Sequence, residues 1–508
     1  MRMTNKIMQT NSLYNINQTK ILEDKYNTQL TSQSKITRPS DDPVVAIRAL
    51  RLRSNVSTVS QYNEKNAKDA DQWLDVTAKA LDTITDVIKN LYNQVQTGVN
   101  KDYTASDMQV LLTQIDAYTH EMYATGNQDY AGRFIFTGYR TDTALTVDEN
   151  DLAREYDITE NIKAAQLDSF SYTDHSTFDT TTATQSATEL LIKNATLNRV
   201  RLSYNDLNVD KAAAMTIEAK QADGTAITLP TPKIVPTDYA TADEAYQAML
   251  ANELQDDADV APMAIYIPET GEILYDRKTA ETLQDAIDNG GQIATTYNKK
   301  AWLKDDLNPQ HFFECTDVAK GITYNAGGDL DTQITYDVGY NQVIQVNTNA
   351  YEVFDPAITR DYQDLKRLVN EFTEIEQVRA DLKAARDAVK DDPAAYEEAS
   401  KRYDAADKAY TYVRDAVSVR FGEQISRYQA YLDATNVAIT KNGTRSTRLE
   451  LIGTRLENQQ STFKELQEEN EGIDMTEVAV LLTAAKTTYD AALAATSKIM
   501  QNNLMNYI

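Results

Sequence analysis

From Leu52 to Leu91, hydrophobic residues recur at alternating intervals of four and three residues. The stripe consists of Leu52, Val56, Val59, Asn63, Asn66, Ala70, Trp73, Thr77, Ala80, Ile84, Val87 and Leu91. Nine of these twelve positions are apolar, and a period near 3.5 residues predicts a helix packed lengthwise in a helical core. Asp42 followed by Pro43 predicts the start of this helix, because an acid suits the N-cap and proline suits the first helical position.

The C-terminal part of the chain carries matching helical patterns. One stripe consists of Met475, Val478, Leu482, Ala485, Tyr489, Ala492, Thr496 and Ile499. Asp474 and Glu477 predict a capping box at its start. An earlier stripe, which we expect to end near Gly472, consists of Leu449, Ile452, Leu456, Gln459, Phe463 and Leu466. Residues 358–440 also have a helical pattern, interrupted at Asp391-Asp392-Pro393.

The first thirty residues predict a helix with only a narrow apolar stripe. Ile7, Tyr14 and Ile21 are seven residues apart in a segment rich in Asn, Gln and Thr. Such a helix is marginal alone and needs a partner. Here and in the last helix we favour contacts completed in an assembly, and ordinary bundle core is the alternative. The expected assembly residues are Ile7, Tyr14 and Ile21 at the N-terminal end and Val478, Leu482, Ala485, Tyr489, Ala492 and Ile499 at the C-terminal end.

Residues 141–355 have a different pattern. A hairpin signal surrounds Asp223-Gly224, alternating runs occur at 264–267, 334–336 and 343–346, and glycine pairs lie at 290–291 and 327–328. The predicted fold class is mainly α with an inserted β-rich (α+β) domain, and a long helical bundle or coiled coil formed by the N- and C-terminal segments. The expected segments are 1–43 (assembly helix and turn), 44–140 (helical core), 141–355 (outer domain), 356–472 (helical core with an extra helical stretch) and 473–508 (assembly helix).

Composition supports long helices and narrows the function. The 508 residues include only 16 Gly and 10 Pro, and no proline lies within 44–229 or 394–508. A net charge of -27 argues against a nucleic-acid partner, although residues 1–60 hold nine Lys/Arg against four Asp/Glu. No run reaches the roughly 18 to 20 apolar residues of a membrane span, and no secretory hydrophobic region follows the first residues. We therefore expect a soluble chain with no membrane partner and no cleavable export signal.

Candidate chemical sites are sparse. Cys315 is the single cysteine, which excludes an intramolecular disulfide and a Cys-rich zinc site. His311 and Cys315 could offer two ligands on one helical face, but only His120 and His175 could add others, so we expect no metal site. His120-Glu121 begins like a zinc protease motif that Ala124 breaks. Asp41-Asp42 could bind a cation or act as an acid/base pair, and turn and cap chemistry is the favoured interpretation. We expect no catalytic residue and no cofactor.

Three segments carry a family resemblance. Residues 28–53 contain the R-P-S-D-D-P run of Arg38, Pro39, Ser40, Asp41, Asp42 and Pro43. Residues 127–141 read N-Q-D-Y-A-G-R-F-I-F-T-G-Y-R-T, and an N-E-G-I-D-M-T-E run starts the last helix. In this order and position, the segments resemble the bacterial flagellar hook-associated protein 3 family, which is related to flagellin. The resemblance covers about 1–141 and 425–508. Gln33 stands where that family commonly has glycine.

The resemblance implies a non-enzymatic structural subunit at the junction between hook and filament. It implies export through the flagellar type III channel, location in the flagellum outside the cell, and a helical core built from both termini. The implied partners are hook-associated protein 1, flagellin, an export chaperone and further copies of the chain in a junction ring.

Two alternatives stay open from the sequence. Flagellin, the filament subunit, tends to read S-A-[KA]-D-D-A-A-G where this chain has R-P-S-D-D-P, which favours the junction protein. A secreted enzyme with its site in 141–355 is the other alternative, although that region lacks a metal or nucleophile constellation.

Overall fold

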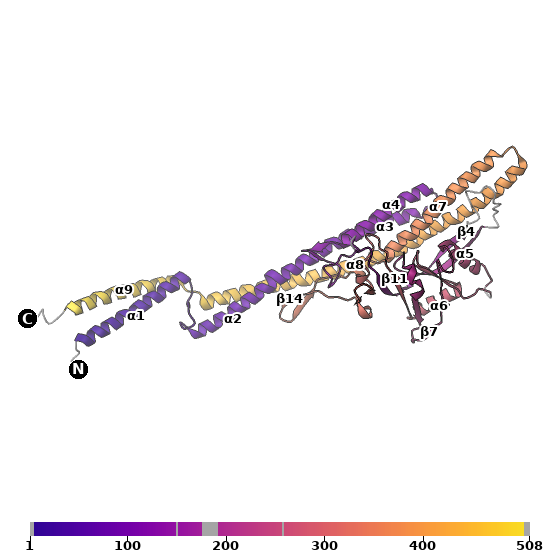
Figure 1. The fold of residues 1–508 in the computed structure, drawn as a ribbon. Coiled ribbons are helices and arrows are strands. Elements are labelled where there is room, and N and C mark those ends of the chain that lie inside the picture. Colours follow the sequence, from indigo (N-terminus) through magenta and orange to yellow (C-terminus); the bar gives the residue numbers. More distant parts are fainter. Residues whose placement is uncertain (1–4, 149–150, 175–191, 257–258, 502–508) are drawn as a thin grey trace, which may run out of the picture. The chain divides into compact units, whose positions relative to one another are not determined.

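The structure, a computed structural model, describes residues 5–148, 151–174, 192–256 and 259–501. Long helices form both ends of the described chain, and strands concentrate between them (Figure 1). The α-helices are α1 (Asn5–Ser32), α2 (Pro43–Ser60), α3 (Lys68–Gly98), α4 (Ala105–Gly126), α5 (Ala242–Glu253), α6 (Arg277–Asp288), α7 (Ala357–Ala388), α8 (Pro393–Glu471) and α9 (Met475–Gln501). This confirms the predicted mainly α fold with an inserted β-rich region.

The strands are short and mostly antiparallel. They are β1 (Asp129–Tyr130), β2 (Arg133–Phe134), β3 (Tyr156–Asn161), β4 (Leu167–Asp174), β5 (Lys193–Arg201), β6 (Thr216–Lys220), β7 (Ala226–Ile227), β8 (Lys233–Ile234), β9 (Ala264–Ile267), β10 (Glu272–Tyr275), β11 (Gln292–Lys299), β12 (Glu314–Asp317), β13 (Ile322–Tyr324), β14 (Thr335–Gly339) and β15 (Gln342–Gln345). β6 and β7 pair across the turn at Asp223-Gly224, so the predicted hairpin is confirmed.

The chain divides into two compact units. Unit 1 comprises Met1–Asp71, Tyr336–Ile344 and Thr447–Ile508, and unit 2 comprises Gln72–Thr335 and Gln345–Ser446. This division differs from the segments expected from the sequence, because most of the β14–β15 hairpin belongs with the terminal helices instead of with the remainder of 141–355.

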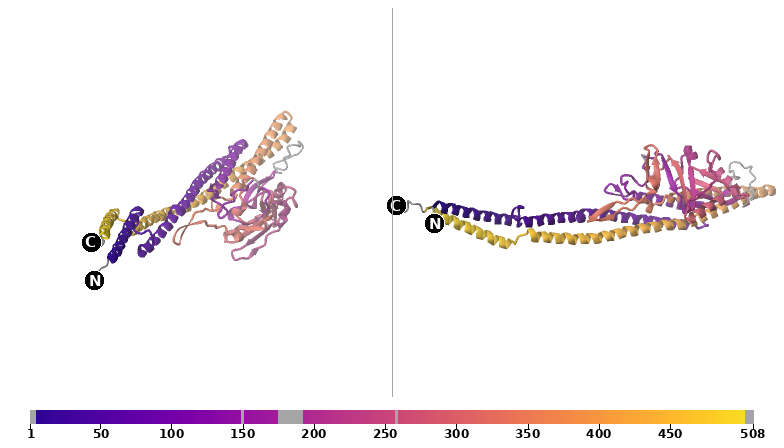
Figure 2. Two further views of the ribbon diagram at one scale, coloured as in Figure 1. Left: turned by 60° about the vertical axis from the view of Figure 1, so that its left-hand side comes forward. Right: turned by 90° about the horizontal axis from the view of Figure 1, so that it is seen from below.

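In unit 1, helices from the two ends of the chain pack as pairs. α1 and α9 lie side by side (Figures 1 and 2). α2 is joined to the last turns of α8, where the Asn470 side-chain amide donates to the Val45 carbonyl at 3.1 Å and Arg53 forms an ion pair with Glu471. The prediction that N-terminal helices pack on C-terminal ones is confirmed within this unit.

A π-helix, Gln61–Ala67, separates α2 from α3. It contains Asn63 and Asn66, two of the polar exceptions in the stripe from Leu52 to Leu91. The β14–β15 hairpin attaches here, because the Asn66 amide donates to the Asp337 carbonyl at 2.8 Å and the Tyr336 hydroxyl donates to the Asp69 carboxylate. The polar interruption of the stripe therefore marks a docking point for a hairpin distant in sequence.

Unit 2 contains the helical core and the β-rich region. Along α3, all of the stripe from Ala70 onward is buried, as expected for core. Two sheets, ordered β4-β5-β10-β9-β8 and β13-β12-β3-β11-β6-β7, share a core that includes Val200 and Tyr266 from the first and Ile158 and Tyr297 from the second. The first sheet buries its other face partly against α5, through Leu197, Ile265 and neighbouring residues.

Candidate assembly surfaces and a buried ion-pair network

The R-P-S-D-D-P segment forms a turn and a helix cap. One Asp41 carboxylate oxygen accepts from the backbone N–H groups of Arg38 at 2.9 Å and Thr37 at 3.1 Å, and these bonds lower the pKa of Asp41. Asp42 occupies the N-cap position of α2 and accepts from the N–H groups of Val44 and Val45. Pro43 is the first helical residue. The two adjacent carboxylates thus accept hydrogen bonds from backbone N–H groups on opposite sides of the turn.

The turn before this segment contains Gln33 in a left-handed conformation, with φ of 53°. A side chain disfavours this region by roughly 1 to 2 kcal/mol, which glycine avoids. The neighbouring Ser34 pairs with Gly472 in an isolated antiparallel bridge. The departure from the family pattern at Gln33 therefore leaves the chain with a strained residue at the end of α1.

The N-terminal assembly residues all lie on the exposed side of α1. Ile7, Tyr14 and Ile21 are 49%, 62% and 60% exposed. Ile16 is buried instead, on the side of α1 that packs against α9. No described element of unit 1 buries these three side chains, and their contact with another subunit stays a prediction.

The described C-terminal assembly residues, in contrast, lie on the buried or half-buried side of α9. Val478 and Ala485 are buried, and Leu482, Tyr489 and Ala492 are half-buried. They lie on the side of α9 that packs against α1 of the same chain. The side chain of Ile499 lies outside the described residues. The outward side of α9 instead carries Val480, Leu481 and Leu493, which the sequence pattern did not single out.

By length and composition α9 also reaches the threshold for a membrane-crossing helix. Within Met475–Lys498, a stretch of 18 residues has a mean hydropathy of 1.2, and 11% of that stretch is buried. No continuous apolar run of 18 residues occurs here, but alanines among the larger apolar residues raise the mean hydropathy enough for a membrane-crossing helix by length and composition alone, which the sequence pattern did not indicate. The packing against α1 accounts for one apolar side of this helix.

The described residues considered as metal ligands lie in different elements of the fold. His311 lies in a short 3-10 helix, Pro309–His311, and its Nε2 lies 3.0 Å from the Ala144 carbonyl oxygen. Burial lowers the pKa of His311 to about 4 and raises that of Cys315, in β12, to about 12. His120 lies near Asp116 and Asp305, and His175 falls outside the described residues. Within the described ranges, no cluster of three or more candidate ligands occurs.

The second family-like segment, 127–141, folds into the β1–β2 hairpin and the loop after it. The Arg133 guanidinium lies over the Trp73 ring at 4.7 Å from its centroid, which attaches the hairpin to α3. Gly138 has φ of 60°, and a Cβ atom there would lie 2.0 Å from the Thr332 hydroxyl oxygen. This segment therefore has a packing role, in which glycine permits a close approach.

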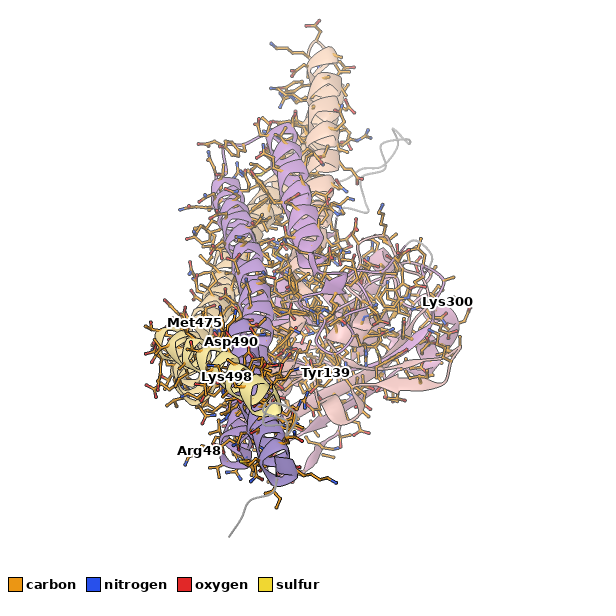
Figure 3. The ribbon with its side chains drawn as sticks, turned by 90° about the vertical axis from the view of Figure 1, so that its left-hand side faces the viewer. Arg48, Tyr139, Lys300, Met475, Asp490 and Lys498 are labelled. Atoms are coloured by element: carbon orange, nitrogen blue, oxygen red, sulfur yellow. The ribbon has the colours of Figure 1, made fainter. Side chains whose placement is uncertain are left out.

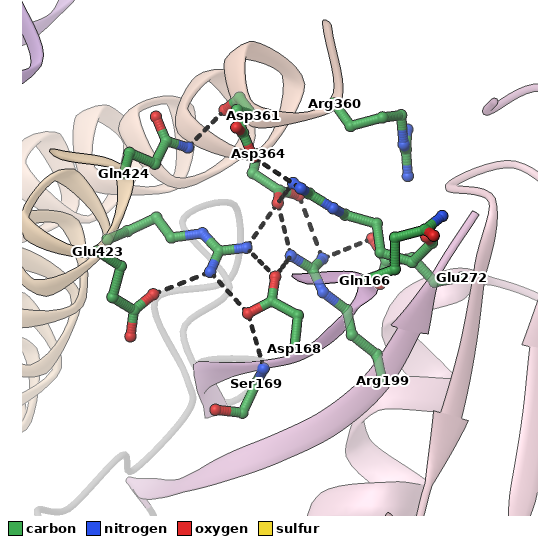
Figure 4. Close-up of polar contacts among 12 residues, drawn as sticks. Gln166, Asp168, Ser169, Arg199, Glu272, Arg360, Asp361, Asp364, Glu423 and Gln424 are labelled. Atoms are coloured by element: carbon green, nitrogen blue, oxygen red, sulfur yellow. Dashed lines mark hydrogen bonds and ion pairs between the residues drawn. The ribbon is translucent and has the colours of Figure 1, made fainter. Parts of the chain in front are cut away.

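A buried ion-pair network joins the first sheet to α7 and α8 (Figure 4). Arg199 on β5 binds Glu272 of β10 at 2.8 Å, Asp168 of β4 at 2.9 Å and Asp364 of α7 at 2.5 Å. Arg420 of α8 binds both Asp168 and Asp364 at 2.6 Å. All five side chains are at most 6% exposed, so these two arginines and three carboxylates interact away from water.

A second carboxylate on α7 extends the network. Asp361 binds Arg201 of β5 at 2.7 Å and Arg427 of α8 at 3.0 Å, and it accepts from the Tyr431 hydroxyl at 2.8 Å. Burial alone would raise the pKa of Asp364, but Arg199, Arg420 and Arg201 hold it well below its ordinary value. A carboxyl held ionised in this way stabilises the folded state at neutral pH.

Sequence reasoning missed this network, although a signal existed. Asp361 and Asp364 interrupt the apolar face of α7 that contains Ile358 and Leu365. Charged residues at core positions indicate buried partners, but they do not identify those partners. The partner arginines on β5 and α8 come from distant parts of the chain.

The N-terminal part of the chain, which contains two of the three family-like segments, matches a known family model. Residues 3–141 match the model of the bacterial flagellin N-terminal helical region. Flagellar hook-associated protein 3 of Escherichia coli (strain K12) is 28% identical over 145 residues, which cover 28% of this chain and 45% of that protein. Flagellar hook-associated protein 3 of Salmonella typhimurium (strain LT2) is 26% identical over a stretch with the same coverage.

The chain thus spans about 45% of the length of these flagellar relatives. The resemblance to flagellar hook-associated protein 3 expected from the sequence is confirmed. A crystal structure of flagellar hook associated protein-3 from Legionella pneumophila aligns with 82% of this chain and 98% of its own, at 8% identity and a TM-score of 0.28.

Proposed function

We propose that this protein is a structural subunit of the bacterial flagellum that acts as an adaptor at the hook–filament junction. The observation that carries the proposal is the flagellin N-terminal helical region in unit 1 and the start of unit 2, together with the hook-associated protein 3 similarity. The exposed apolar residues of α1 and α9 support it further, because they offer surfaces that further subunits could cover.

An adaptor needs one set of contacts toward the hook and another toward the filament. Accordingly, hook-associated protein 1 and flagellin are the proposed partners on the two sides, with further copies of this chain around the junction. An export chaperone would bind the subunit before secretion through the flagellar type III channel, and the assembled protein would lie outside the cell. No chemical step is needed for this role, so we propose no enzymatic activity.

Flagellin is the less supported alternative. The curated relatives are hook-associated proteins, and the R-P-S-D-D-P turn differs from the usual flagellin sequence at that place. For an enzyme sited in the β-rich region, the described residues offer no cluster of three or more His, Cys, Asp or Glu side chains that could hold a metal ion.

Deletion of the gene tests the proposal. Electron microscopy should show complete hooks without filaments, and unpolymerised flagellin should accumulate in the medium. Supplying the full chain from a plasmid should restore filaments. Normal filaments on the deletion strain would contradict the adaptor role, and filaments built mainly from this chain would favour the flagellin alternative.

A further inference from the structure

An exposed face of α2 combines apolar and basic side chains. Ile47 and Arg51 lie near the middle of this face, flanked by Val44, Leu50 and Arg48. Ile47 is 56% exposed, and Figure 3 shows the Arg48 side chain extending away from the ribbon. Neither Arg48 nor Arg51 forms an ion pair with any residue that the structure describes, whereas Arg53 pairs with Glu471. We call Val44, Ile47, Arg48, Leu50 and Arg51 the basic face.

The last turns of α8 carry an exposed face of opposite charge. Glu465, Glu468 and Glu469 point outward, with Leu466, 43% exposed, at one edge. Their carboxylates have no ion-pair partner within the described part of the chain. We call these four residues the acidic face.

Contacts within unit 1 place the two faces at the same level along the paired helices α2 and α8. Asn470 is bonded to Val45, Arg53 to Glu471, and the Gln460 amide donates to the Ser60 hydroxyl at 2.7 Å. α2 and the end of α8 therefore run side by side in opposite directions. Their inward sides are buried against one another, and the basic and acidic faces point away from the pair on opposite sides.

We propose that the basic face of one copy binds the acidic face of a second copy of this chain. Two different faces on opposite sides of one unit form a head-to-tail contact, which can propagate from copy to copy and close into a ring. Because the two faces lie at the same level along the helix pair, neighbouring copies can join in a ring without one copy being shifted along the ring axis relative to the next. Opposite charges steer the approach and fix the register, and the apolar residues among them supply buried area.

This inference rests on the proposed function and adds the contact that would hold the junction ring together. Charge complementarity between the basic and acidic faces favours a second copy over a different partner. One copy supplies the unpaired arginines and the next supplies the unpaired glutamates, so a single repeated contact uses both faces.

Cysteine crosslinking tests the geometry. Ser54 lies in the middle of the outward side of α2, one turn beyond the basic face, and Ser461 lies on the outward side of α8, one turn before the acidic face. Flagella would be isolated from cells whose only copy is Ser54→Cys, Ser461→Cys or the double variant, and treated with a short bismaleimide. Cys315 is buried, so it adds little background.

The double variant should give a ladder of multiples of the chain on a denaturing gel, and each single variant should stay monomeric. A Ser54→Cys, Ser106→Cys chain serves as the control, because Ser106 is exposed on α4 and belongs to neither face. A dimer from either single variant would indicate a like-with-like contact and overturn the proposal. Crosslinks to a protein of another size, or no crosslinks in assembled flagella, would overturn it as well.

Charge exchange tests the pairing. Arg51→Glu and Glu465→Arg should each lower incorporation of the subunit into flagella at least tenfold, and the two together should restore it to within about twofold. Lys383→Glu, on the exposed side of α7, applies the same charge change elsewhere and should have no effect.

Failure of the double variant to recover incorporation would refute the pairing. If these variants assemble normally while the gene deletion still prevents filament growth, the contact is wrong and the adaptor function stands. If the deletion strain has normal filaments, the adaptor function itself fails.

Discussion

Ser34 and Gly472, near opposite ends of the chain, pair as an antiparallel bridge, and the N–H of the adjacent Lys35 donates to the Glu471 carbonyl at 2.6 Å. Ser34 follows α1, and Gly472 separates α8 from α9. The bridge therefore ties the turn after α1 to the turn before α9. A Cβ atom at Gly472 would lie 2.5 Å from the Glu468 carbonyl oxygen, so this position requires glycine.

Gln33→Gly should stabilise this turn. The substitution removes the left-handed strain of Gln33, and the greater flexibility of glycine in the unfolded chain offsets part of the gain. We expect unit 1 to gain about 0.5 to 1 kcal/mol, measured by hydrogen exchange of α1 amides. Gln18→Gly, in the middle of α1, is the matched control and should cost about 1 kcal/mol. Equal effects of the two variants would contradict the strain at Gln33.

Asp364→Asn should destabilise unit 2 strongly. The change leaves Arg199, Arg201 and Arg420 with a buried amide in place of a carboxylate, and breaking a buried pair costs about 3 to 5 kcal/mol. Urea unfolding followed by circular dichroism would measure the change. The control is Asp415→Asn, which breaks an exposed pair with Lys101 and should cost less than about 1 kcal/mol. A loss for Asp364→Asn as small as for the control would show that the network is not stabilising.

The ion-pair network should resist mild acid. The folded-state pKa values of Asp364 and Asp168 are depressed, so their stabilising contribution is fully present above the unfolded pKa of about 3.9. It should be lost as pH falls below about 4 toward the folded values. The difference in unfolding free energy between the unmodified chain and Asp364→Asn should stay constant from about pH 7 to 5 and shrink below about pH 4. A difference that already shrinks near pH 6 would contradict the depressed pKa values.

Two aspartate substitutions on α9 should separate packing from assembly. Tyr489→Asp places a charge on the half-buried side that packs against α1, so it should speed hydrogen exchange in α1 as well as prevent incorporation. Val480→Asp lies on the outward side, where Val480 is 64% exposed, and should leave exchange unchanged while lowering incorporation. Normal incorporation of Val480→Asp would remove the outward side of α9 from the assembly surface.

The sequence determined the helical framework because its signals are local. The cap at Asp42-Pro43, the restart at Asp392-Pro393 and the stripe from Ala70 to Leu91 depend on backbone donors and on a helical period, which neighbouring residues specify. The family-like segments likewise consist of short local motifs. These features sufficed for the mainly α fold and for the resemblance.

The tertiary structure alone decided which faces remain free. An apolar stripe does not say what covers it, and the stripe on α9 faces α1 while the stripe on α1 at Ile7, Tyr14 and Ile21 is exposed. The partners of Asp361 and Asp364 come from β5 and α8, because burial of a charge requires an opposite charge at a distance that only the folded chain sets. The same holds for the basic and acidic faces, whose shared level along the helix pair follows from contacts between α2 and α8.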